Sequence, residues 1–308
     1  MQKQKNKKNN LMTIIIIALI LSSIYKILGI IFIFLLIAFK IINKFQLSFL
    51  KKEVNKLNYV INDKQFNNST LKNQLMQSKD LLQNLNIYPK FKLEKNKKYL
   101  HIALNSNLSE ARKIISEIPF SDRILIEVGT PLIKIYGSKA ISEIKKIVPF
   151  GTYIIADNKC ADLAAREVQI MAKAGANAAT CLGIAPIETI NSFIEECQKN
   201  KINSIIDMMN VENALMLLKQ LKKQPDIVIL HRGVDETKFS KEKQIPYYQI
   251  KQIKGSYDIL IAVAGGDTIQ EIKRAILNDV DIVVLWEAFY KSNSNIKQLV
   301  NLFLQEIR

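Results

Sequence analysis

Two aspartates and a lysine lie close together in the run ADNKCAD at residues 156–162, as Asp157, Lys159 and Asp162. The run follows an apolar segment, residues 152–155, that is typical of a buried strand. Residues two apart in a strand face the same side, so Asp157 and Lys159 are expected to point into one interior. Such a group is costly in an apolar core and useful in a polar catalytic site. The alternative is a surface cluster of ion pairs where a strand meets a helix.

The elements that must position this group alternate regularly from Tyr99 onward. Apolar stretches of strand length are followed by stretches of helical length, such as 163–174, 187–200 and 211–223. Eight such units predict an α/β fold, a closed parallel (β/α)8 barrel over residues 99–308. The predicted strands are 100–104, 123–128, 152–156, 178–182, 204–207, 227–231, 259–264 and 282–285.

Polar residues occupy the carboxyl ends of most of these strands. In a parallel barrel the strand ends share one face, and that face carries the active site. His231 is one of only two histidines in the chain, so it is a natural candidate for proton transfer. The alternative is a buried imidazole with a structural role. The polar strand ends are Asn105, Glu127, Asp157 with Lys159, Asp207, His231 with Arg232, and Gly265 with Gly266.

The pair Gly265-Gly266 ends the seventh predicted strand and has no side chains to keep a ligand away from its backbone. Thr268 and Glu271 form a capping box that starts the next helix. Backbone amides and the positive end of a helix dipole together suit a phosphate group. The alternative is a tight strand–helix turn without a ligand.

Charge and apolar residues set the first third of the chain apart. Residues 1–98 hold 18 lysines and four acidic residues, so +14 of the formal net charge of +16 lies there. Residues 11–39 contain Lys26 as their single charged residue and are long enough for one membrane-spanning helix. We therefore predict a basic tail at 1–10 and a membrane anchor at 11–39, with a membrane rather than nucleic acid as the partner of the lysines. A helix lying in the membrane interface is the alternative.

The cysteines indicate the compartment of the barrel. Lysines flank the apolar segment on both sides in similar number, so charge does not fix its orientation. Cys160, Cys181 and Cys197 show no paired spacing, and an odd number of thiols is typical of a reducing compartment. The prediction is a membrane-anchored protein with its barrel in the cytoplasm.

Residues 40–89 join the anchor to the barrel, and within them 50–85 carry a heptad repeat. Eight of the eleven core positions are apolar, at the alternating spacings of four and three that a left-handed coiled coil requires. Asn68 falls at an a position, where a buried Asn favours a parallel dimer. A homodimer is therefore predicted. The alternative is one amphipathic helix that packs on the barrel.

Several strand-end motifs together are similar to those of one enzyme family. The motifs, in the strand order of that family, are IEVGTP at 126–131, ADNKCAD at 156–162, DMMNV at 207–211, HRGVD at 231–235 and AGG at 264–266. With these aligned, residues 99–308 resemble the orotidine 5′-phosphate decarboxylase suprafamily and, within it, the 3-hexulose-6-phosphate synthases. The resemblance implies a Mg²⁺-dependent aldolase-type lyase on a sugar phosphate, with formaldehyde and ribulose 5-phosphate as reactants.

The resemblance also implies a role for each motif residue. Glu127 and Asp157 would hold Mg²⁺, which suits carboxylate oxygens on adjacent strands. Lys159 would stabilise the charge of an enediolate or move a proton, with His231 as acid or base. In this family the counterpart of Asp162 reaches the partner's site across a dimer interface. The residues expected to contact substrate are Asn105, Asp207, Arg232, Gly265 and Gly266.

The sequence departs from the family at two strand ends. Asn105 stands where the family has an acidic residue, and an amide brings no charge. Trp286 and Glu287 stand where the family has a glycine-containing loop that closes on phosphate. Two alternatives to the synthase follow. One is decarboxylation of orotidine 5′-phosphate or a keto-gulonate phosphate, and the other is a catalytically silent, membrane-tethered barrel that acts as a scaffold or sensor.

Overall fold

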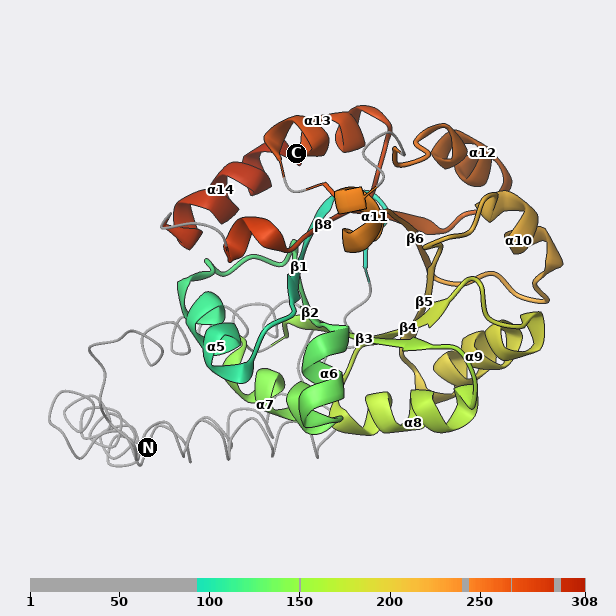
Figure 1. Cartoon of the computed structure of the whole chain (residues 1–308), viewed down its shortest axis with the longest axis horizontal. Coiled ribbons are helices and arrows are strands. Elements are labelled where there is room, and N and C mark those ends of the chain that lie inside the picture. Colours follow the sequence, from blue (N-terminus) through green and yellow to red (C-terminus); the bar gives the residue numbers. More distant parts are fainter. Residues whose placement is uncertain (1–92, 150, 240–243, 267, 291–294, 308) are drawn as a thin grey trace, which may run out of the picture. The chain divides into compact units, whose positions relative to one another are not determined.

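Eight parallel strands form a closed barrel, and helices surround it on the outside (Figure 1). The strands follow one another around the barrel in sequence order. This computed structural model describes residues 93–149, 151–239, 244–266, 268–290 and 295–307. The predicted (β/α)8 architecture is therefore confirmed.

The predicted N-terminal elements lie outside the described residues. They are the basic tail at 1–10, the membrane anchor at 11–39 and the coiled coil and linker at 40–89. Among the helices that the structure does describe, none combines the length and the apolar character that crossing a bilayer requires. The anchor and the coiled coil stay predictions.

Each strand pairs in parallel with its neighbours, and β8 closes the barrel against β1. The observed strand bounds agree with the predicted ones to within a residue, except that β3 continues past its predicted end at Ala156. The strands are β1 Tyr99–Leu104, β2 Ile124–Val128, β3 Tyr153–Cys160, β4 Ala178–Leu182, β5 Asn203–Asp207, β6 Ile227–His231, β7 Leu260–Ala264 and β8 Ile282–Leu285.

Helices connect the strands on the outer surface. The capping box predicted from Thr268 and Glu271 is present at the start of α13. The segment after β6 carries two short helices, α11 and α12. The helices are α5 Leu108–Glu117, α6 Thr130–Tyr136, α7 Lys139–Ile147, α8 Ala164–Ala174, α9 Ile187–Asn200, α10 Ala214–Gln220, α11 Val234–Phe239, α12 Tyr248–Ser256, α13 Ile269–Leu277, the 3-10 turn Glu287–Phe289 and α14 Ile296–Glu306.

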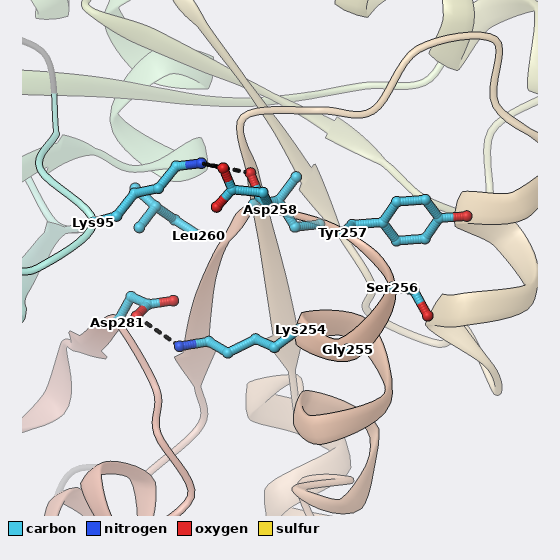
Figure 2. A pocket seen from close by; sticks show the side chains of 9 residues that line it. Lys95, Lys254, Gly255, Ser256, Tyr257, Asp258, Leu260 and Asp281 are labelled. Atoms are coloured by element: carbon cyan, nitrogen blue, oxygen red, sulfur yellow. Dashed lines mark hydrogen bonds and ion pairs between the residues drawn. The ribbon is translucent and has the colours of Figure 1, made fainter.

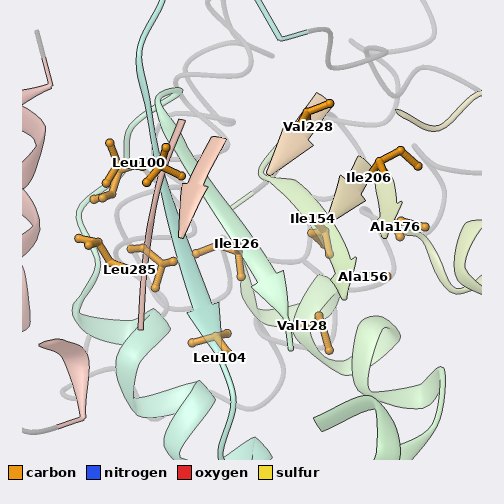
Figure 3. Packing of buried hydrophobic residues seen from close by; sticks show 14 of the residues in the cluster. Leu100, Leu104, Ile126, Val128, Ile154, Ala156, Ala176, Ile206, Val228 and Leu285 are labelled. Atoms are coloured by element: carbon orange, nitrogen blue, oxygen red, sulfur yellow. The ribbon is translucent and has the colours of Figure 1, made fainter. Parts of the chain in front are cut away.

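Alternation along the strands separates two apolar layers. Outward-facing residues such as Leu104 and Val128 belong to the layer between strands and helices (Figure 3). Inward-facing residues such as Leu125 and Ile155 fill the interior of the barrel. Asp157 follows Ile155 at a spacing of two, so it faces the same interior one step closer to the carboxyl end. The strand period thus places a layer of polar side chains at the carboxyl ends of the strands, next to the apolar residues that fill the rest of the barrel interior.

The third strand carries an irregularity within the motif that holds Asp157 and Lys159. Between Ala156 and Cys160, three residues of β3 occupy the space of one residue of β4, Thr180. Lys159 lies in this bulge with a φ of 45°, a left-handed conformation that non-glycine residues rarely adopt. Bulges next to active sites change the direction of a side chain.

Candidate active site

Charged side chains meet inside the barrel at the carboxyl ends of four strands. Glu127, Asp157 and Asp207 are 6%, 7% and 1% exposed, while Lys159 and His231 are partly buried. Buried charges of this kind persist only with partners of opposite sign or hydrogen-bond donors. The group is therefore an interior polar cluster, and the alternative of a surface ion-pair cluster is excluded.

Lys159 lies between two carboxylates. Its Nζ is 2.8 Å from Asp207 Oδ2 and 3.3 Å from Asp157 Oδ1. Burial alone would lower the pKa of the ammonium, but the charges of Asp157 and Asp207 outweigh it and raise that pKa above its usual value. Lys159 is thus a fixed cation at neutral pH, suited to stabilise negative charge that develops on a substrate.

Asp207 also contacts His231 through its carboxylate. The Nδ1 atom of the imidazole lies 3.0 Å from Oδ1 and 2.9 Å from Oδ2 of this carboxylate. Burial works against ionisation, yet His231 and Lys159 together lower the pKa of Asp207 to about 2. Burial also opposes protonation of His231, but Asp207 outweighs it and raises the pKa of the imidazole. With Nδ1 held by Asp207, Nε2 is the nitrogen that can exchange a proton with a substrate.

Two threonine hydroxyls hold the carboxylate of Asp157. Thr130 Oγ1 donates to Oδ2 at 2.6 Å, and Thr180 Oγ1 donates to Oδ1 at 2.9 Å. Burial and the nearby charge of Glu127 raise the pKa of Asp157. The hydroxyls therefore fix the orientation of a carboxylate in an environment that disfavours its charge.

Glu127 contacts a second histidine, His101, whose Nε2 lies 2.7 Å from Glu127 Oε2. His101 is 1% exposed and stands on β1, opposite Leu125 of β2. Burial raises the pKa of Glu127, but the imidazole outweighs burial and the pKa lies below its usual value. The interpretation of the sequence missed His101, Thr130 and Thr180. The period-two alternation of β1 and β4 was the signal that could have placed His101 and Thr180 in the interior.

Glu127 and Asp157 were predicted to hold Mg²⁺, and their placement fits such an ion. They lie on adjacent strands, and burial together with the charge of Glu127 raises the pKa of Asp157, so a divalent cation would relieve repulsion between them. Mg²⁺ is commonly bound by one or two carboxylates while it keeps several waters. Among the described residues, no three His, Cys, Asp or Glu side chains form a metal-binding group. The fit is therefore to a two-carboxylate site.

Gly265, Gly266 and Arg232 lie together where β6 and β7 end. The Arg232 N–H donates to the carbonyl of Ala264 at 3.0 Å. Gly265 has a φ of 111°, and a Cβ added there would lie 2.6 Å from the Arg232 carbonyl oxygen. Glycine is thus required for the turn itself, so its presence alone does not demonstrate a phosphate site.

The ends of β1 and β8 are joined by an aromatic turn. The N–H of Asn105 donates to the hydroxyl of Tyr290 at 3.1 Å. The rings of Trp286 and Tyr290 pack with their centroids 6.4 Å apart, and Phe289 is buried against Phe303. An aromatic turn therefore occupies the place where the resemblance implies a glycine-containing phosphate loop.

Asp162 lies outside this interior cluster. Its side chain is exposed, and its carbonyl oxygen accepts from the Cys160 thiol at 3.2 Å. Leu163, which follows it, precedes α8 with a φ of 51° and is 65% exposed. The single chain thus does not bring Asp162 to Lys159, and the predicted role of Asp162 in a partner's site stays a prediction.

A pocket of about 370 Å³ lies near the amino end of β7, away from the strand ends described above (Figure 2). Its charged residues are paired: Lys254 Nζ is 2.8 Å from Asp281 Oδ1, and Lys95 contacts Asp258. The amino face of such barrels generally serves stability. The catalytic candidates all lie on the other face.

The sequence is similar to one protein family and to several known enzymes. The sequence model of the orotidine 5′-phosphate decarboxylase / HUMPS family matches residues 98–297. The bifunctional enzyme Fae/Hps of Methanothrix thermoacetophila is 37% identical over 212 residues, which are 68% of this chain and 53% of the relative. The bifunctional enzyme Fae/Hps of Methanocella arvoryzae is 42% identical over 191 residues, 61% of this chain and 48% of the relative. The chain thus spans about half the length of these curated relatives.

Solved structures share the fold. The 3-hexulose-6-phosphate synthase from Salmonella typhimurium is similar with a TM-score of 0.61 and 27% identity, covering 68% of this chain and 98% of the other. An orotidine 5′-monophosphate decarboxylase from Methanocaldococcus jannaschii matches with a TM-score of 0.52 and 20% identity, covering 69% and 100%, and shows the fold alone. From the family match and these relatives, the chain belongs to the orotidine 5′-phosphate decarboxylase / HUMPS family.

Proposed function

We propose that the barrel is an aldolase-type carbon–carbon lyase that interconverts 3-hexulose 6-phosphate with formaldehyde and ribulose 5-phosphate. The observation that carries this proposal is the pair of contacts made by Asp207, which holds Lys159 at 2.8 Å and His231 at 2.9 Å inside the barrel. The relatives named Fae/Hps and the similar 3-hexulose-6-phosphate synthase support the choice of reaction.

The reaction requires a proton acceptor and a site for negative charge. The Nε2 atom of His231 would take and return the proton, since Nδ1 is held by Asp207. The ammonium of Lys159 would stabilise the enediolate oxygen, because its raised pKa keeps it charged. Asp207 would orient both groups without itself taking the proton, since its pKa is about 2.

Glu127 and Asp157 would hold Mg²⁺, which supplies Lewis-acid polarisation of the sugar carbonyl when it is bound. Thr130 and Thr180 would keep the Asp157 oxygens in place for that role. Asn105 would contact a substrate hydroxyl, while Arg232 and the Gly265-Gly266 turn would serve the phosphate end.

The proposed assembly is a membrane-anchored homodimer. Residues 11–39 would anchor the chain, residues 40–89 would pair as a coiled coil, and the barrel would lie in the cytoplasm. The exposed position of Asp162 is compatible with its use in the site of a partner subunit. This part rests on the apolar run, the heptad and the family resemblance.

A second candidate is a catalytically silent barrel that acts as a tethered scaffold or sensor. The observation that favours it is the aromatic turn of Trp286 and Tyr290, bonded to Asn105 at the end where phosphate is expected. The polar cluster around Asp207 favours the enzyme, because buried charged networks are costly to keep without a use.

The test is an assay of the full-length chain with Mg²⁺ for formaldehyde release from 3-hexulose 6-phosphate. Lys159→Ala is the matched control, since it removes the central cation. The synthase proposal expects activity in the wild type and a loss of about 1000-fold or more in the variant. Equal activity in both, or none in the wild type, would contradict it. Decarboxylation of orotidine 5′-phosphate or 3-keto-gulonate 6-phosphate, measured as CO₂ release, would favour the alternative lyase.

A further inference from the structure

The bulge in β3 has an unusual set of hydrogen bonds. Register is lost between Ala156 and Cys160, so the regular strand ladder does not satisfy the backbone there. Side chains take its place: the Lys159 N–H donates to Thr180 Oγ1 at 2.9 Å, and the Thr180 N–H donates to Asn158 Oδ1 at 3.3 Å. The bulge is therefore closed by side chains on both strands, with Thr180 at its centre.

The hydroxyl of Thr180 makes two contacts of opposite kind. It accepts from the backbone of Lys159 and donates to Asp157 Oδ1 at 2.9 Å. Thr180 is fully buried, so water cannot replace either contact. One hydroxyl thus connects the backbone of the central cation to the side chain of a carboxylate beside it.

The conformation of Lys159 needs such a contact. A φ of 45° is unfavourable for a residue with a Cβ, and it persists only where the surroundings determine it. In that conformation the Lys159 Nζ reaches both Asp157 and Asp207. If the bulge relaxed to a regular strand, the register beyond Ala156 would shift by two residues. The Lys159 side chain would then keep its face but move along the strand, away from its partners.

We propose that Thr180 is a positioning residue, whose hydroxyl holds the β3 bulge in the shape that directs Lys159 and Asp157 into one site. Thr180 does not itself touch the reacting atoms in this arrangement. The kinetic part of this inference rests on the proposed synthase activity, and the structural part does not.

The test compares three variants of the full-length chain. Thr180→Val keeps the shape of the side chain and removes its hydroxyl, while Thr180→Ser keeps the hydroxyl. Ser204→Ala is the matched control, because Ser204 is a buried hydroxyl on β5 that contacts a carboxylate, Asp226, at 3.0 Å outside the cluster. Steady-state kinetics, thermal unfolding and a crystal structure are measured for each.

The expected result is a fall in kcat of about 100-fold for Thr180→Val with KM changed by less than about threefold, since displacement of a catalytic group by 1 Å has an effect of that size. Thr180→Ser should return kcat to within about threefold of the wild type. Ser204→Ala should leave kcat unchanged even if it lowers Tm. In the crystal structure of Thr180→Val, Lys159 should leave the left-handed region and its Nζ should move away from Asp207.

The inference is overturned if Thr180→Val keeps wild-type kcat, or if Lys159 keeps its conformation and contacts in that variant's structure. Should the valine variant fail to fold, Thr180→Ala replaces it, and equal kcat in Thr180→Ala and Thr180→Ser overturns the inference. If the wild type lacks synthase activity, the proposed function fails. The crystal structures alone then test whether the Thr180 hydroxyl holds the β3 bulge.

Discussion

The ammonium of Lys159 lies 2.8 Å from a carboxylate oxygen of Asp207, although the two residues stand on strands that are not neighbours in the barrel. This contact crosses the interior above β4 from the bulged segment of β3 that holds Lys159. Asp207 is buried and binds His231 with the same carboxylate. One carboxylate thus determines the charge and the position of both groups proposed to act on the substrate.

Asp207→Asn should reduce stability in a pH-dependent way. The pKa of Asp207 is about 2 in the folded chain and about 3.9 in an unfolded one, so its contribution is present above pH 4 and is lost as pH falls toward 2. The raised pKa of His231 acts in the other direction: its contribution is present below about pH 6.5 and is lost as pH rises through the folded value.

The difference in unfolding free energy between wild type and Asp207→Asn should therefore be largest between about pH 4 and 6.5, at roughly 2 kcal/mol or more. Urea denaturation at several pH values measures it. Asp235→Asn, an exposed change on α11, is the control that should leave the pH dependence of the wild type intact. If the difference in unfolding free energy does not vary with pH, His231 and Lys159 do not lower the pKa of Asp207.

The fold and much of this polar cluster could be predicted from the sequence, for a physical reason. The period of two in the strands and the polar residues at their ends determine which side chains enter the interior, and Glu127, Asp157, Lys159, Asp207 and His231 all follow that rule. The bulge could not be predicted, since it depends on the contact of Thr180 with a different strand. His101 was missed because it lies before the strand end, in a layer where apolar residues are usual.

Removal of either predicted metal ligand should weaken Mg²⁺ binding. Glu127→Gln and Asp157→Asn should each raise the Kd for Mg²⁺ about tenfold or more, because each removes one of two carboxylates that suit the ion. Isothermal titration calorimetry with Mg²⁺ alone measures this without reference to activity. Asp226→Asn, at the amino end of β6, is the control. Unchanged affinity in both variants would place any Mg²⁺ elsewhere.

Gly265→Ala should impair binding of the phosphorylated substrate through a local change in the turn at Gly265. A Cβ at Gly265 would lie 2.6 Å from the carbonyl oxygen of Arg232, and the φ of 111° is strained for alanine. The turn must therefore shift, and KM should rise about tenfold. Gly137→Ala is the matched control, since its φ is also positive, at 62°, but its Cβ meets nothing within 4 Å. An equal effect of both variants on KM would exclude a specific role for the Gly265 turn.

Mixing two inactive variants should restore activity if Asp162 serves the site of a partner subunit. Asp162→Ala and Lys159→Ala would each be inactive as homodimers, because every site would lack one of the two residues. A heterodimer of the two variants would keep one site with both residues intact, so random exchange of subunits should give about a quarter of wild-type activity. Each variant mixed with itself is the control, and the sedimentation of the mixture confirms the dimer. Asp162 is exposed in the single chain, at a strained turn before α8, so a role within its own barrel would require that turn to move. Absence of recovery in a confirmed heterodimer would assign Asp162 to such an internal role or to none.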